Sequence, residues 1–230
     1  MTVFPESHLG VHLADPRTLR TLELTADGAG LMLGRNRQRH PVTARLFRPE
    51  HTRVLLAGDL RCAQLFAFRA LALNAQIIIQ SARPAAWEGF SRALGRVVAG
   101  GSVHFIPPGT PHRAVGTRIR PVLVVLDVGP AVGNLQQTEA AWQATLNVRD
   151  TLTAWDVDSL VRADLVVMQP LSRMEAALAA STLGLTEVQE WLWRIRGDMV
   201  TLVNRGTVRW AQLAPSSVER QVIGMPTRTS

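Results

Sequence analysis

Short apolar runs separated by segments of helical periodicity constrain the fold of this chain more than any other feature. The runs, rich in valine, leucine and isoleucine, lie at 53–57, 77–79, 103–106, 122–126 and 165–168. Strands buried on both faces of a parallel sheet have this composition, and each parallel pair needs a crossover that is usually helical. We therefore expect an α/β fold with a mostly parallel central sheet flanked by helices, of the Rossmann-like or glycosyltransferase-like kind.

Both ends of the chain carry strand signals, which predict additional antiparallel strands. These strands are expected at 19–25, 30–33, 41–47, 200–203, 208–213 and 218–223. Helices are expected at 61–73, 85–94, 157–161, 172–183 and 186–199, and one more strand at 142–148. Because no serine-rich or charged linker interrupts the pattern, we expect a single α/β domain over residues 1–230.

The complete absence of lysine excludes several classes of chemistry. All 25 basic residues are arginine, and tyrosine is absent as well. Without lysine the chain has no Schiff-base residue, no lysine general base and no P-loop lysine to hold nucleotide phosphates. Cys62 is the only cysteine, which excludes an intrachain disulfide and a cysteine-based zinc site. The sequence also has no G-x-S-x-G or H-E-x-x-H motif, and it predicts no cofactor.

The turn Gly58-Asp59 follows the first apolar run and stands where nucleotide-binding α/β proteins hold phosphate. Such a loop needs several glycines and a helix N-terminus that is free to meet the anion. Here a single glycine is followed by an aspartate, whose carboxylate accepts hydrogen bonds from the helix N–H groups and repels phosphate. We therefore expect Asp59 to be an N-cap rather than a nucleotide or ribose contact.

Three further aspartates are candidates for metal binding. Asp127 ends the run VLVVL, as the metal-coordinating aspartate of P-loop ATPases ends its strand. Without a P-loop motif, however, we expect Asp127 to cap the next turn. Asp156 and Asp158 form the D-x-D pattern by which many nucleotide-sugar glycosyltransferases hold a divalent cation. The same pattern is common before a helix, so the cap interpretation is favoured and the pair remains an alternative metal site.

Basic side chains concentrated early in the chain define a candidate contact surface. This arginine stripe comprises Arg35, Arg37, Arg39, Arg45, Arg48 and Arg53, with Glu50 as the single acidic residue among them. Its charge would attract an anionic membrane surface, nucleic acid or an acidic partner. Only Phe47 adds an aromatic ring for base stacking, so nucleic-acid binding is not expected. Trp191 and Trp193, on different faces of a predicted helix, form the second candidate surface.

A series of spaced turn and apolar positions has the outline of a known family. The positions are Gly34-x-Asn36, Pro41-Val42, Phe47-x-Pro49, Gly58-Asp59, Phe66, Phe68-Arg69-Ala70, Ala75, Trp87-Glu88-x-Phe90, Arg92 and Leu94-Gly95, with Val222-Ile223-Gly224-x-Pro226 further on. This outline resembles the cytosolic domain of EccE proteins, components of the actinobacterial type VII (ESX) secretion complex. The EccE-like stretch covers about residues 20–106, followed by C-terminal strands within 200–224. Residues 121–199 do not align, and the transmembrane helices of the family are missing.

The resemblance implies a non-enzymatic accessory or structural component of a type VII secretion system that acts through protein–protein contacts. Its partners would be other secretion components, with peripheral contact to the membrane complex, and a homo-oligomer is compatible with this role. No segment has the pattern of a secretory signal or the length of a membrane span, so we expect a cytoplasmic protein, peripheral to the inner face of the membrane. The alternative function is a nucleotide-sugar-binding or glycosyltransferase-like enzyme that uses the D-x-D pair.

Overall fold

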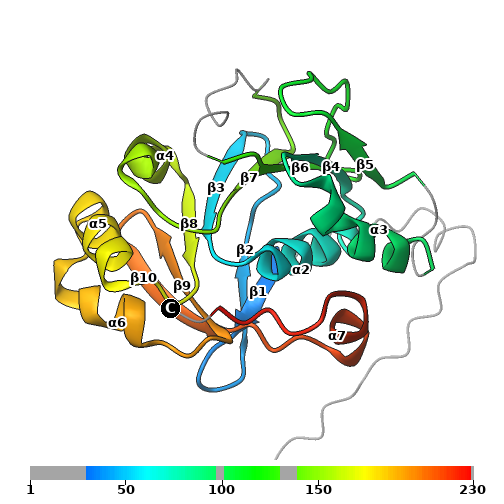
Figure 1. The fold of residues 1–230 in the computed structure, drawn as a ribbon. Coiled ribbons are helices and arrows are strands. Elements are labelled where there is room, and N and C mark those ends of the chain that lie inside the picture. The colour runs from blue at the N-terminus through cyan, green and yellow to red at the C-terminus, as the bar shows by residue number, and fades with distance from the viewer. Residues whose placement is uncertain (1–29, 97–100, 130–138, 229–230) are drawn as a thin grey trace, which may run out of the picture.

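In the computed structural model, which describes residues 30–96, 101–129 and 139–228, the strands form one mixed sheet (Figure 1). They are β1 (Leu31–Arg35), β2 (Pro41–Ala44), β3 (Thr52–Ala57), β4 (Gln76–Ser81), β5 (Val103–Ile106), β6 (Val122–Asp127), β7 (Gln143–Arg149), β8 (Leu165–Met168), β9 (Met199–Asn204) and β10 (Thr207–Gln212). Their spatial order is β2-β1-β10-β9-β8-β3-β7-β6-β4-β5. The six strands from β8 to β5 in this order run parallel, whereas β9, β10, β1 and β2 add antiparallel pairs at one side. The predicted fold class is confirmed.

Helices cover both faces of this sheet. They are α2 (Leu60–Leu71), α3 (Glu88–Leu94), α4 (Val157–Arg162), α5 (Arg173–Leu183), α6 (Gln189–Arg194) and α7 (Ser217–Ile223), with short 3₁₀ turns η1 (Pro84–Trp87), η3 (Ala154–Asp156) and η4 (Thr186–Val188). Helices α2, α3 and α7 pack on one face, and α4, α5 and α6 pack on the other (Figure 1). None of the helices in the described residues is long and apolar enough to cross a bilayer.

The central strand β3 shows why the apolar runs are continuous. Val54 and Leu56 belong to the core under α2, whereas Leu55 and Ala57 belong to the core under α4, α5 and α6. Successive side chains of a strand point to opposite faces, so a strand covered on both sides needs apolar residues at every position. The run RVLLA therefore marks a strand in the middle of a three-layer arrangement.

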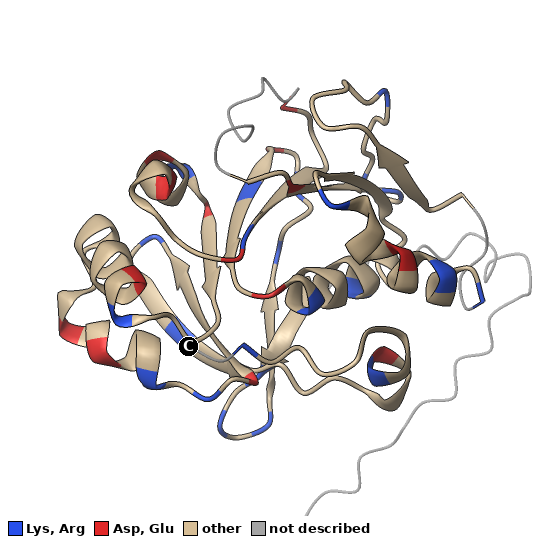
Figure 2. Cartoon of the chain, viewed as in Figure 1, with Lys and Arg blue, Asp and Glu red and all other residues tan. Residues whose placement is uncertain are grey.

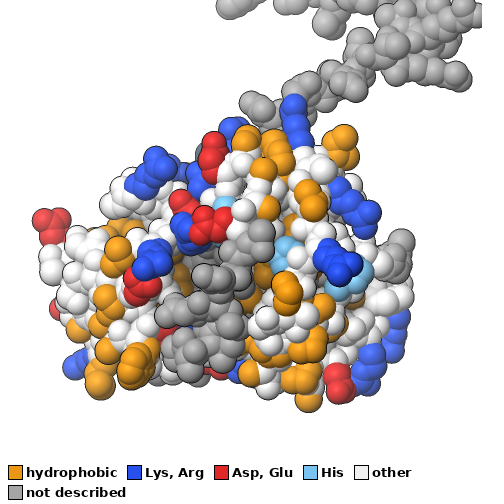
Figure 3. All heavy atoms as spheres, turned by 90° about the horizontal axis from the view of Figure 1, so that it is seen from above, with side chains coloured by type: hydrophobic (Ala, Val, Ile, Leu, Met, Phe, Trp, Pro, Cys, Tyr) orange, Lys and Arg blue, Asp and Glu red, His pale blue; other side chains and the backbone are white. Residues whose placement is uncertain are grey.

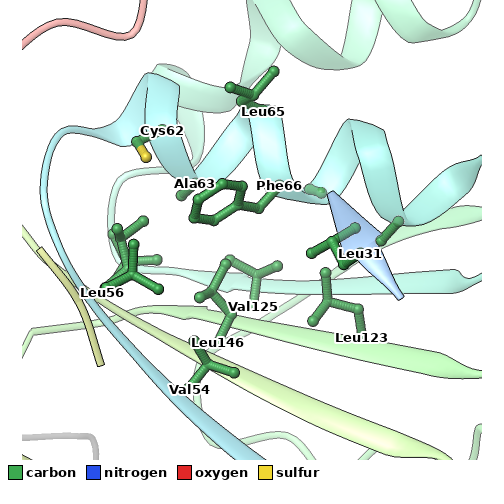
Figure 4. Packing of buried hydrophobic residues seen from close by; sticks show 14 of the residues in the cluster. Leu31, Val54, Leu56, Cys62, Ala63, Leu65, Phe66, Leu123, Val125 and Leu146 are labelled. Carbon is green, nitrogen blue, oxygen red and sulfur yellow. The ribbon is translucent and has the colours of Figure 1, made fainter. Parts of the chain in front are cut away.

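Helix α2 is held in place by the apolar side chains that it turns toward the sheet. Phe66 reaches down toward Leu146 and Val125 of the central strands, and Cys62 lies in the same layer (Figure 4). Each of these side chains is at most 2% exposed. Burial of a large apolar side chain of this kind contributes about 1.5–3 kcal/mol. This packing holds the N-terminus of α2 at the carboxyl end of β3.

Two predicted elements differ in the structure, and one predicted strand, at 19–25, lies outside the described residues. Residues 217–223 form helix α7 instead of a strand, because Ser216 and Glu219 make a reciprocal capping box. Helix α6 ends at Arg194 and not at 199, since Met199 begins β9, which pairs along its full length with β10. Both errors came from apolar spacing that two kinds of element can satisfy.

Helix α7 is joined to α2 by a buried ion pair. The guanidinium of Arg69 donates to the carboxylate of Glu219 at 2.7 and 3.2 Å, and also to the carbonyl of Leu213 at 2.9 Å. Burial alone raises the pKa of Glu219, but the hydrogen bonds from Arg69 and from the backbone of Ser216 outweigh it and hold this pKa below its ordinary value. The ionised carboxylate is thus favoured in the folded state.

The lowered pKa of Glu219 predicts a pH-dependent contribution to stability. A depressed carboxyl pKa stabilises the fold above the pKa of the unfolded chain, and this contribution is lost as the pH falls through the folded pKa. We expect Glu219→Gln to be less stable at neutral pH and to lose less free energy of unfolding on acidification than the unchanged chain. Urea denaturation at neutral and acidic pH measures both. Glu190→Gln, in an exposed pair with Arg194 on α6, is the matched control; an equal change in its acid dependence would contradict the assignment.

Candidate functional site

The carboxyl ends of the parallel strands enclose the candidate site. From β3 the chain enters α2 on one face of the sheet, whereas from β7 it continues into α4 on the other face. Adjacent parallel strands whose connections leave to opposite faces open a crevice, which is where open α/β sheets bind ligands. A pocket of about 440 Å³ lies at this edge. Its lining comprises Asp59, Leu60, Arg61, Gln64, Arg83, Ala86, Asp150 and Arg228.

The turn from β3 into α2 is closed by hydrogen bonds within the protein. The carboxylate of Asp59 accepts from the backbone N–H of Cys62 at 2.9 Å, which confirms the predicted N-cap. The backbone N–H of Asp59 in turn donates to the side-chain oxygen of Gln169 at 2.7 Å. A Cβ at Gly58 would lie 2.5 Å from that same oxygen, so any other residue here would displace the Gln169 side chain from the turn. Burial raises the pKa of the Asp59 carboxyl.

Asp127, at the end of β6, is the most heavily bonded acidic side chain of the site. Its Oδ2 accepts from the hydroxyl of Ser81 at 2.8 Å and from the indole Nε1–H of Trp87 at 2.9 Å. The guanidinium of Arg83 donates to both of its oxygens at 2.8–3.0 Å. Among the described residues, the partners of the Asp127 carboxylate lie at and after the end of β4, whereas most of the turn that Asp127 was predicted to cap lies outside them.

Arg83 connects two acidic strand ends. Besides Asp127 it donates to the carboxylate of Asp150, which follows β7, through both Nη atoms. These hydrogen bonds to Asp150 and Asp127 raise the pKa of Arg83 above its ordinary value. One guanidinium thus spans the ends of β4, β6 and β7, in the fork geometry that arginine offers to carboxylates.

The segment after α7 returns across the same edge of the sheet (Figure 1). The carbonyl of Pro226 accepts from the side-chain amide of Gln169 at 3.1 Å, and the carbonyl of Met225 accepts from Arg61 at 3.4 Å. Arg228 donates to the carboxylate of Glu175 at 2.7 Å and to the carbonyl of Asp150 at 2.5 Å. The crevice is consequently bordered by the α2 turn on one side and by this segment on the other.

The D-x-D pair does not converge on a metal site. Asp156 is fully buried, and its carboxylate accepts hydrogen bonds from the guanidinium of Arg149 at 2.6 Å and from the backbone N–H of Thr153. The side chain of Asp158, in contrast, is 56% exposed and pairs with Arg162. The cap interpretation is confirmed and the D-x-D metal site is wrong. No cluster of three or more potential metal-ligating side chains occurs within residues 30–96, 101–129 and 139–228.

Neither of the two predicted contact surfaces contributes a residue to the lining of the crevice, and the two lie far apart in the sequence. The exposed residues Arg35, Arg37 and Arg39 are in the hairpin of β1 and β2, where Figure 2 shows basic positions side by side. Arg48 and Arg53 pair with Asp164 and Glu139. Seen from above, arginine side chains are interspersed with apolar, acidic and histidine side chains rather than gathered in one field (Figure 3).

Trp191 and Trp193 differ in exposure, as their spacing predicted. Trp191 is 57% exposed on α6, whereas Trp193 is partly buried against the core of that face. The guanidinium groups of Arg173 and Arg194 each lie 4.8 Å from the Trp193 ring centroid, within cation–π range. The role of Trp191 and of the arginine stripe as contact surfaces stays a prediction.

Among the residues of the crevice that were not found from the sequence, four lie in loops. Each of these residues follows a strand or helix by one to five positions, in a segment with the composition of an ordinary polar loop. They are Arg83, Asp150, Gln169 and Arg228. A signal existed for three of them. Arg83 and Gln169 follow runs predicted as parallel strands, Asp150 follows the strand predicted at 142–148, and the carboxyl ends of parallel strands share one edge. Arg228 gave no such signal.

Comparison with solved structures finds this fold in VirB4. VirB4 of Thermoanaerobacter pseudethanolicus matches with a TM-score of 0.61 at 8% identity, over 85% of this chain and 99% of VirB4. The genome-packaging NTPase B204 of Sulfolobus turreted icosahedral virus 2, in complex with ATP-γS, gives 0.46 at 13% identity, over 72% of this chain and 98% of B204. No protein-family model and no curated protein matches the sequence. The likeness to VirB4 shows a shared fold.

This likeness contradicts the predicted function. The solved structure that shares this fold is that of VirB4, and this finding overturns the predicted non-enzymatic accessory of type VII secretion. The enzyme alternative fails for a separate reason, because Asp156 and Asp158 point into different surroundings. The sequence indicated only a general α/β fold, because it contains no P-loop motif.

Proposed function

We propose that this chain is an NTPase-type domain that binds a nucleoside polyphosphate in the crevice at the carboxyl ends of β3, β4, β6 and β7. In this proposal the domain serves a secretion machine, on the cytoplasmic side and peripheral to its membrane complex. The likeness to VirB4 supports the class of machine, and the position of the pocket supports the class of ligand. The resemblance of residues 34–95 to EccE proteins stays a prediction beside it.

The observation that carries the proposal is the charge of the pocket lining. Three guanidinium groups, those of Arg61, Arg83 and Arg228, line the pocket against the carboxylates of Asp59 and Asp150. Arginine recognises phosphate through planar pairs of N–H donors, so it can provide the charge for which a P-loop uses lysine. Arg61 suits this role best, because it is exposed in the first turn of α2 and, within the described residues, it is held by a single hydrogen bond, to the carbonyl of Met225 at 3.4 Å.

Binding of a fluorescent ATP analogue, followed by anisotropy, tests the proposal. We expect saturable binding to the unchanged chain, with unlabelled ATP and ADP as competitors. Arg61→Ala is expected to weaken the affinity about tenfold, since a hydrogen bond to a charged group contributes about 1.5–3 kcal/mol.

Arg92→Ala is the matched control for that variant. Arg92 is another exposed helical arginine, paired with Glu88 on α3 and absent from the pocket lining. Its affinity for the analogue should equal that of the unchanged chain. Absence of saturable binding, or an equal loss in both variants, would overturn the proposed function.

A further inference from the structure

P-loop NTPases use the acidic end of a strand to hold Mg²⁺, which bridges the nucleotide phosphates. Asp127 occupies such a strand end here, but its carboxylate does not fit a metal. Both oxygens already accept hydrogen bonds, from Ser81, Arg83 and Trp87, at 2.8–3.0 Å. The side chain is only 5% exposed, so a hydrated cation has no open path to it.

The positive charge beside the carboxylates of Asp127 and Asp150 comes from a protein side chain, the guanidinium of Arg83. Arg83 reaches from the turn after β4 and bridges Asp127 to Asp150, whose side chain is 52% exposed. Two carboxylates on neighbouring strands would repel each other across the crevice, and the guanidinium between them neutralises that repulsion. A single side chain thereby fulfils the bridging role that a divalent ion has between acidic residues.

We infer that the guanidinium of Arg83 is a built-in cation that takes the place of the divalent metal in this crevice. A polyphosphate ligand would then bind without Mg²⁺, beside the Arg83–Asp150 pair. The ligand part of this inference rests on the proposed function, whereas the replacement of the metal rests on the geometry of Asp127, Arg83 and Asp150 alone.

Direct titration with Mn²⁺, a spectroscopically visible substitute for Mg²⁺, tests the replacement. We expect the unchanged chain to show no saturable Mn²⁺ binding by electron paramagnetic resonance. Arg83→Met removes the charge and keeps most of the aliphatic stem, so it should gain a Mn²⁺ site. Adding Asp127→Asn to that variant should abolish the gained site.

Two results would overturn the inference. One is Mn²⁺ binding by the unchanged chain that Asp127→Asn removes, since the carboxylate would then be a metal ligand in spite of Arg83. The other is a folded Arg83→Met variant, checked by circular dichroism, that gains no site. Arg83→Gln, which preserves hydrogen bonding without charge, provides a second folded variant if the first does not fold.

Nucleotide binding gives a separate measurement on the unchanged chain. The affinity for the fluorescent ATP analogue should agree within about twofold in EDTA and in excess Mg²⁺, whereas a tenfold or greater gain with Mg²⁺ would contradict the built-in cation. If no nucleotide binds under either condition, the proposed function fails. The Mn²⁺ titrations still decide the role of Arg83 in that case.

Discussion

Replacing Asp156 by alanine is expected to lower the free energy of unfolding by about 3–5 kcal/mol. Its partner Arg149 is 2% exposed and Asp156 is 1% exposed, and the two side chains meet at 2.6 Å. Removal of the carboxylate leaves a guanidinium charge in the interior, for which the carbonyl of Val148 is the remaining acceptor among the residues that the structure describes. Thr153 loses its capping partner as well.

Asp158→Ala is the matched control because it removes the other carboxylate of the D-x-D pattern. Asp158 lies on the exposed side of α4 in an i,i+4 pair with Arg162, and such surface pairs contribute about 0–1 kcal/mol. Urea denaturation of both variants gives the comparison. Equal losses of stability would mean that the two aspartates share one environment, which the structure contradicts.

The parallel core could be predicted from sequence because burial on both faces leaves a direct trace in composition. The runs that became β3, β6 and β8 are apolar at nearly every position, and short helices between them follow from the need for crossovers. The spatial order of these strands has no such trace. Whether β4 lies beside β3 or three places away depends on long-range packing, and that order identifies the site.

Residues 216–219 show that a local signal was available and was not used. The stretch Ser216-Ser217-Val218-Glu219 fits the capping-box pattern that begins helices, yet the apolar residues at 218, 222 and 223 led to the prediction of a strand. In the structure the cap and the ion pair to Arg69 both use Glu219, so tertiary contact and local preference agree.

At the site, the sequence identified two acidic residues that follow strands, and it did not identify the residues that form hydrogen bonds with them. Asp59 and Asp127 were conspicuous as acidic residues after apolar runs, and the N-cap role of Asp59 followed from elementary helix chemistry. The partner of Asp127 could not be found in the same way, because Arg83 lies 44 positions earlier in the chain. Only the adjacency of β4 and β6 in the sheet brings the two together.

Asp127→Ala is expected to lower the free energy of unfolding by about 3 kcal/mol, since it removes one acceptor from several donors at once. The indole N–H of Trp87, a fully buried side chain, loses its hydrogen-bond acceptor, as does the hydroxyl of Ser81. Trp87 packs edge-to-face on Phe90 in α3, with ring centroids 5.7 Å apart, so the loss extends into the helix layer. Thermal and urea denaturation measure the change.

Asp150→Ala is the control, because it removes the second carboxylate that holds the same guanidinium. Asp150 is half exposed, and its pair with Arg83 is in contact with solvent, so the expected loss is below about 1 kcal/mol. A large loss for Asp127 and a small one for Asp150 would mean that Asp127 organises the interior while Asp150 faces the crevice. Arg83 then has one side fixed in the fold and one side turned to the pocket, which is the arrangement that a built-in cation requires. The reverse order of losses would place the structural anchor at β7 and contradict this division.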